Sequence, residues 1–175
     1  MNQPLLNLSE DDLTRALAYA GLVLLAYELV KSLIISPIRL FYRDTDFTSG
    51  PFKSYEEDVL SRHKNEFEAC LLYLRDFMEV IDSDDVLAIQ EFRKHRNEIA
   101  HDLPSKLKHL NIQSYAPLLK GADKALFKLS NHRTYMEIGH DPEFQGKGID
   151  WETVYGTEYM LFKEVIKKVK FWARA

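Results

Sequence analysis

The sequence predicts an all-α protein, an antiparallel bundle of about five helices that forms a single domain over residues 1–175. Apolar residues recur at steps of three and four in several long segments, and no segment alternates polar and apolar residues as a half-buried strand does. With 46% hydrophobic and 29% charged residues in 175, the chain has the size and composition of one globular domain.

The first predicted helix begins at Ser9, which three acids follow, and runs to roughly Ser36, because Pro37 comes next. Its middle reads LAYAGLVLLAYELV and is apolar almost all round. Such a pattern is typical of a helix that its neighbours bury on most sides. The turn formers of residues 43–54 predict a loop after it.

The second predicted helix begins near residues 54–55 and carries one apolar stripe. The stripe comprises Phe67, Cys70, Leu71, Leu74, Phe77, Met78 and Ile81. A third helix begins at Ser83 and ends around Asp102, because Pro104 disfavours helical geometry at Leu103.

Two further helices complete the predicted bundle. Ser114 begins the fourth helix, and the glycine-rich segment 139–150 predicts a mobile loop after it. The last helix runs from Trp151, with apolar residues at three-to-four spacing, and ends in the lysines up to Lys170.

Composition bounds the partners and the compartment. A net charge of −4 argues against non-specific coating of nucleic acid, while a local basic cleft stays compatible with it. The one cysteine, Cys70, cannot form an internal disulfide, which favours a reducing, cytoplasmic setting. The longest apolar stretch, Ala16–Tyr27, is about half the roughly 20 residues that span a bilayer, so we expect no membrane span and no secretory signal.

The third predicted helix contains one residue that does not suit its place. Successive residues lie ~100° apart around a helix, which groups Ile89, Phe92, Ile99, Ala100 and Leu103 in one apolar sector. Arg96 falls near the middle of that sector. A buried arginine is costly unless carboxylates, a partner chain or a bound anion compensate its charge. We therefore expect Arg96 at a cleft or a subunit interface.

The cations beside Arg96 have simpler interpretations. Arg93, Lys94 and His95 are the charged end that any helix is expected to carry near its C-terminus. His101 lies in the last turn, where the helix dipole favours the imidazolium and suits a group that exchanges protons near neutral pH.

The six residues RNEIAH, from Arg96 to His101, resemble the R-x4-H signature of the HEPN ribonuclease superfamily. Its members are small helical bundles that act chiefly as RNA-cleaving toxins and antiphage effectors. The resemblance implies that Arg96, Asn97 and His101 are site residues, with no metal and no cofactor. It also implies a site shared between two chains, and hence a homodimer or a partner, an RNA substrate and regulation by an antitoxin or another protein.

The residue types suit metal-free RNA cleavage. The neighbouring 2′-hydroxyl is the nucleophile, so the site needs a group that moves protons and a cation that stabilises a phosphorane-like transition state. His101 and Arg96 fill these roles, and Asn97 would orient the phosphate or the imidazole. The expected products are a 2′,3′-cyclic phosphate and a 5′-hydroxyl.

Two alternatives remain open. A bundle of this type can be a dimeric binding module without nuclease activity, because a fold does not guarantee its chemistry. A di-metal site would use the pairs Glu98–His101 and Glu137–His140 with Glu28 and Glu66, but the second pair falls in the predicted loop. Cys70 looks too buried to act as a nucleophile.

Overall fold

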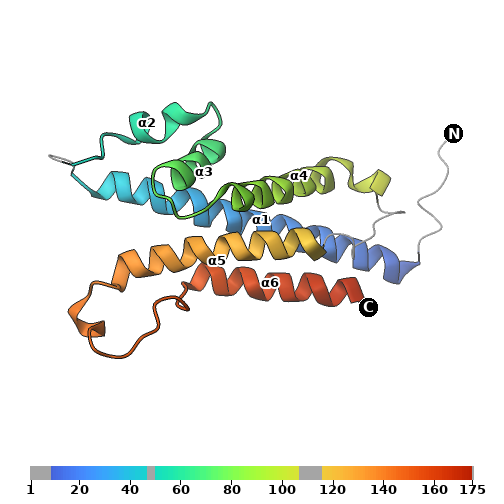
Figure 1. The fold of residues 1–175 in the computed structure, drawn as a ribbon. Helices are drawn as coiled ribbons and strands as arrows, with labels where there is room; N and C mark the ends of the chain where they lie inside the picture. The colour runs from blue at the N-terminus through green and yellow to red at the C-terminus, as the bar shows by residue number, and fades with distance from the viewer. Residues whose placement is uncertain (1–8, 47–49, 107–115, 175) are drawn as a thin grey trace.

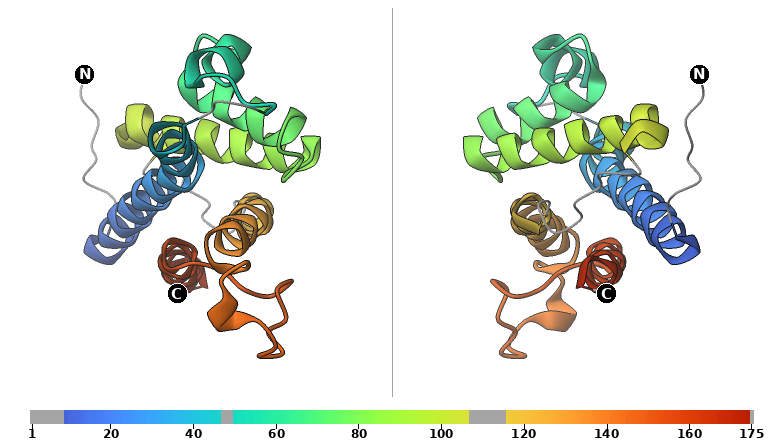
Figure 2. Two further views of the ribbon diagram at one scale, coloured as in Figure 1. Left: turned by 90° about the vertical axis from the view of Figure 1, so that its left-hand side faces the viewer. Right: turned by 90° about the vertical axis from the view of Figure 1, so that its right-hand side faces the viewer.

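The computed structural model describes residues 9–46, 50–106 and 116–174, and these residues form six α-helices and two short 3₁₀ helices without a strand. The prediction of an all-α protein is confirmed. Figures 1 and 2 show three layers, with α2 and α3 on one side, α1 and α4 in the middle, and α5 and α6 on the other side. Helices α4, α5 and α6 run in alternating directions (Figure 1).

Helix α1 (Glu10–Asp44) is longer than predicted, because it continues through Pro37. The prediction that it ends at Ser36 is wrong. Pro37 removes one backbone hydrogen bond, but Leu33, Ile34 and Ile38 on either side of it are at most 5% exposed. Burial of these side chains offsets the lost bond. By length and composition alone α1 could cross a membrane, as could the buried core helices of many soluble proteins. In its most apolar stretch of 18 residues, 44% are buried in this structure.

The second predicted helix is broken into three parts: α2 (Tyr55–Asp58), a 3₁₀ turn (Leu60–Arg62) and α3 (Glu66–Asp76). Asp58 is buried at the break, where it accepts hydrogen bonds from the Tyr42 hydroxyl at 2.8 Å and the Lys53 amide at 2.7 Å. Asn65 then starts α3, because its side chain accepts from the Glu68 amide.

Helix α4 (Ser83–Lys106) leaves helical geometry at Asp102, whose φ is −130° and ψ is 20°. The predicted end around Asp102 is therefore a break within α4: Pro104 disfavours helical geometry at Leu103, but the irregular residue is Asp102, and helical residues continue to Lys106. The predicted cap at Ser114 lies outside the described residues, and α5 covers Ala116–Ile138.

Helix α6 (Thr157–Arg174) begins later than the predicted start at Trp151. The intervening loop is tied to α5: Asn131 Nδ2 donates to the carbonyls of Trp151 at 2.6 Å and Val154 at 2.9 Å. These bonds hold Trp151 outside the helix.

The core forms around α1, which contacts α3, α4, α5 and α6. Its buried side chains include Tyr19, Val23, Tyr27 and Val30. Cys70 of α3 is fully buried, as predicted, and burial raises the pKa of its thiol to about 11. A thiol in this state is a poor nucleophile.

An ion pair between α5 and the start of α4 predicts acid sensitivity. The Lys128 ammonium lies 2.9 Å from Asp82 Oδ2 and holds the pKa of Asp82 down to about 2. Because this value is below the unfolded value of about 4, the pair stabilises the fold above about pH 4 and loses this effect as the pH falls through about 2. We expect Asp82→Asn to lower the urea midpoint at pH 7, and the difference from wild type to shrink in acid.

The control is Asp84→Asn, since exposed Asp84 has no ion pair among the described residues. Asparagine at position 82 can still accept the bond that Asp82 Oδ1 receives from the Asp85 amide, so the test isolates the charge. A difference between Asp82→Asn and wild type that stays constant from pH 7 to acid would contradict the prediction.

Candidate functional site

The site that the sequence predicts lies on the C-terminal half of α4, where Arg96 packs against α1. Its guanidinium carbon is 5.1 Å from the centre of the Tyr27 ring, and Nη2 is 3.5 Å from Glu28 Oε1. The side chain is 27% exposed, and its buried Nε has no hydrogen-bond partner among the described residues. Arg96 therefore lies at the edge of the core, with its terminal nitrogens near solvent.

The buried sector of α4 differs from the predicted one. Ile89, Phe92 and Ile99 are buried as expected, but Ala100 is exposed and His95 is 4% exposed. The buried positions thus shift around the helix along its length, and α4 contacts both α1 and α5. Arg96 consequently stands at the boundary of the buried sector and not in its middle.

Asn97 and His101 continue the site from Arg96. Arg96 Nη1 donates to Asn97 Oδ1 at 3.1 Å, which turns the guanidinium along the surface of α4. Asn97 and His101 are four residues apart and thus neighbours on one helix face. His101 is exposed, one residue before the break at Asp102. The helix is regular from Arg96 to His101, so these two side chains lie ~140° apart around α4, and no hydrogen bond joins them among the described residues.

Tyr27 provides the surface on which Arg96 rests. Burial raises the pKa of the Tyr27 hydroxyl above its ordinary value, although the guanidinium groups of Arg93 and Arg96 act in the opposite direction. The ring therefore stays neutral at physiological pH. Its face attracts the Arg96 cation, an interaction of about 0.5–1 kcal/mol at a partly exposed site.

The sequence suggested that Arg93 is only part of the charged end of the helix, but the structure shows specific contacts. Arg93 pairs with Glu68 of α3, which also accepts from Gln90 Nε2 at 2.7 Å. Its guanidinium carbon lies 5.3 Å from the centre of the Phe67 ring. Arg93 therefore joins α4 to α3 and has a structural role, whereas Lys94 is exposed as expected.

His95 also differs from the prediction of a charged helix end, because it is buried. Its Nε2 shares a hydrogen bond of 2.7 Å with the buried Tyr19 hydroxyl of α1. It also lines a groove of about 480 Å³ between α4 and α5, with Glu91, Lys94 and Glu98 on the same wall. His95 lies three residues after Phe92 and four before Ile99, and this spacing by itself predicts burial. The neighbouring cations Arg93 and Lys94 led instead to the interpretation of an exposed, charged helix end.

The carboxylates of the di-metal alternative are engaged elsewhere. Glu66 is bound by Arg39 and Tyr55, Glu137 by Arg133, and Glu28 by Lys31. Within the described parts of the chain, no three acidic, histidine or cysteine side chains gather as metal ligands would. The structure gives this alternative no support.

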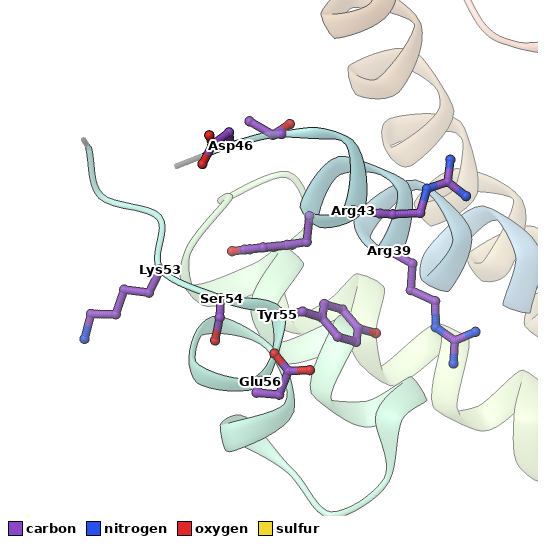
Figure 3. Close-up of a pocket in the computed structure, with 9 residues that line it drawn as sticks. Arg39, Arg43, Asp46, Lys53, Ser54, Tyr55 and Glu56 are labelled. Atoms are coloured by element: carbon purple, nitrogen blue, oxygen red, sulfur yellow. The ribbon is translucent and has the colours of Figure 1, made fainter. Parts of the chain in front are cut away.

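A second cationic region lies at the far end of α1, in the pocket of about 510 Å³ drawn in Figure 3. Arg39, Arg43 and Lys53 line it, but their charged groups point away from one another (Figure 3). Arg39 donates to both oxygens of Glu66 at 2.7 and 2.6 Å, and Arg43 is paired with Asp44. These cations do not converge on a common anion.

No protein-family profile matches the chain, and no curated protein or solved structure shows significant similarity to it.

The Tyr19–His95 bond predicts a measurable loss of stability on removal of one hydroxyl. Tyr19→Phe leaves a buried imidazole nitrogen without its bond to Tyr19, which costs about 1–3 kcal/mol of unfolding free energy. Urea denaturation at pH 7 measures the loss. Tyr155→Phe is the control, since Tyr155 is 43% exposed and should change stability by less than about 0.5 kcal/mol. Equal stability of both variants would show that His95 gains nothing from Tyr19.

Proposed function

We propose that this chain is a metal-independent endoribonuclease of the HEPN type, a helical bundle that cleaves RNA at a site formed by two copies. One observation carries the proposal. Arg96, Asn97 and His101 lie within six residues of α4 just before its break at Asp102, with the Arg96 guanidinium bonded to Asn97 and His101 open to solvent.

In the proposed reaction, the 2′-hydroxyl oxygen attacks the adjacent phosphorus while its proton passes to the neutral imidazole of one His101. The bond from phosphorus to the 5′-oxygen breaks, and that oxygen takes a proton from the imidazolium of the second copy's His101. Arg96 donates to the non-bridging oxygens, whose charge grows in the transition state. The products are a 2′,3′-cyclic phosphate and a 5′-hydroxyl.

The local contacts of Arg96 leave it available to a phosphate. Its partner Glu28 is 52% exposed and lies at 3.5 Å, while the other Glu28 oxygen holds Lys31 at 2.7 Å. Exposed ion pairs of this kind contribute about 0–1 kcal/mol. A phosphate that accepts two hydrogen bonds from the guanidinium can therefore replace Glu28. The Tyr27 ring keeps the guanidinium in place during the exchange.

An exposed apolar stripe beside Arg96 supports a homodimer. Leu13, Leu17, Gly21 and Leu25 follow one another at four-residue steps on α1, and the three leucines are 39%, 50% and 47% exposed. Glu28, which contacts Arg96, continues the same face. A second copy that covers this stripe would lie next to the motif, and open space around Gly21 allows a close approach.

The binding-module alternative also has an observation in its favour. Glu28 and Glu68 neutralise Arg96 and Arg93, which lowers the positive potential that RNA requires. Under this alternative the dimer forms but no phosphodiester bond is cut. A role in toxin or antiphage defence, a cytoplasmic location and control by an antitoxin or other regulatory protein belong to the same proposal as the nuclease.

The nuclease proposal predicts cleavage of single-stranded RNA in the presence of EDTA. Arg96→Ala and His101→Ala should each reduce the rate at least about a hundredfold, because they remove the transition-state cation and the proton carrier. Gel analysis of labelled RNA measures the rate, and alkaline-sensitive cyclic phosphate ends identify the product. Lys94→Ala and His63→Ala are matched controls at exposed positions and should cleave like wild type. Equal cleavage by wild type and both motif variants, all folded by circular dichroism, would refute the proposal.

The dimer proposal predicts that Leu17→Glu converts the protein to a monomer and abolishes cleavage, because a carboxylate cannot be buried in the stripe. Light scattering at micromolar concentration measures the mass. Leu87→Glu is the control, since Leu87 is 57% exposed on α4 and away from the stripe. A wild-type protein that stays monomeric, or a Leu17→Glu dimer, would contradict the composite site.

A further inference from the structure

An apolar groove of about 610 Å³ lies between α1, α3 and α5. Its walls are the end of α1, from Leu33 to Asp44, and the end of α5, from Leu129 to Glu137. Both helices end at the left of Figure 1, while α4 ends at the right with the motif. The groove is therefore separate from the proposed nuclease site.

The groove has a buried floor and an exposed rim. Leu33, Ile34 and Tyr73 form part of the floor and are at most 5% exposed. At the rim, Leu40 is 39%, Phe41 36% and Met136 55% exposed. Large apolar side chains that stand in water around an apolar groove mark an interaction surface.

The charges at the rim do not favour an anion. Arg133 is the rim's cation, and it donates to Glu137 at 2.7 Å and to Glu158 at 3.1 Å, so two carboxylates share it. Glu137 and Asp44 are the carboxylates that line the groove, and Arg43 binds the carboxylate of Asp44. The lining residues Asp44, Arg133 and Glu137 together carry one net negative charge, which does not attract RNA or a fatty acid.

Half-buried His132 adds no positive charge to the groove. Burial lowers the pKa of its imidazole, so the ring is neutral at physiological pH.

We propose that this groove binds a short amphipathic helix of another protein, with an apolar stripe in the groove and lysines or arginines toward Glu137, which shares Arg133 with Glu158. The lengths agree, because twelve residues of α1 and nine of α5 correspond to walls of about 17 and 13 Å, and a helix of about ten residues is 15 Å long. A small molecule on the floor would leave Met136 in water, whereas a helix across the rim would cover it. The net charge of −4 makes a second copy of the chain a poorer partner than a cationic one.

The test uses a fluorescent model peptide of about twelve residues, with leucines at helical three-to-four steps and lysines elsewhere. Fluorescence anisotropy measures its affinity for the full chain. Wild type should bind this peptide at least about fivefold more tightly than Met136→Arg does, since the arginine adds a cation to the rim and removes an apolar contact. Met160→Arg is the matched control, because Met160 of α6 is 53% exposed and outside the groove. It should bind like wild type.

Two further peptides separate the parts of the proposal. A scrambled peptide of the same composition without the stripe, and a peptide with glutamates in place of the lysines, should both bind more weakly. Equal affinity of Met136→Arg and wild type, or of the scrambled and striped peptides, would overturn the proposal. So would self-association of the wild type that Met136→Arg abolishes, which would assign the groove to a second copy. None of these results depends on whether the chain cleaves RNA.

Discussion

Burial of α1 is the constraint on which the other helices depend. Tyr19, Val23, Tyr27, Val30 and Ile34 follow one another at steps of three and four and are at most 5% exposed. Each such side chain contributes about 1.5–3 kcal/mol when it leaves water. Four other helices contact α1, so its apolar residues determine where each of them lies. The same helix supplies Tyr27 and Glu28 to the candidate site and Leu33 to the groove.

Periodicity was enough to predict the long helices, and it failed where a tertiary contact overrides a local rule. Pro37 should have ended α1, yet the apolar stripe continues through it and outweighs one missing hydrogen bond. The break before α3 depends on buried Asp58. Its partner Tyr42 lies 16 residues earlier in the chain, and its partner Lys53 lies in a loop, so neither contributes to the periodic pattern of the helix. Asn65 is a residue type that favours a helix start, but the apolar stripe predicted one uninterrupted helix through this position.

The same limit applies to the site. Arg96 was found from the sequence because a cation interrupts apolar positions, a contrast that a single helix contains in full. His95 was missed because its burial depends on Tyr19, which lies 76 residues earlier in the chain. The buried positions on α4 shift around the helix along its length. Since α4 contacts both α1 and α5, this shift depends on two neighbouring helices and cannot be predicted from the sequence of α4 alone. The proposed dimer surface likewise requires knowledge of which α1 leucines the other helices leave exposed.

Arg93 and Arg96 show what the structure adds to the motif. Both guanidinium groups rest on aromatic rings of the core, and both have a glutamate nearby. Glu68 is 17% exposed and is shared by Arg93 and Gln90, so replacing it would break a partly buried network that joins two helices. Glu28 is mostly in water and binds Lys31 at closer range. The energetic cost of giving up its glutamate is therefore much smaller for Arg96 than for Arg93, and under the proposed function this difference favours Arg96 as the cation that binds a phosphate.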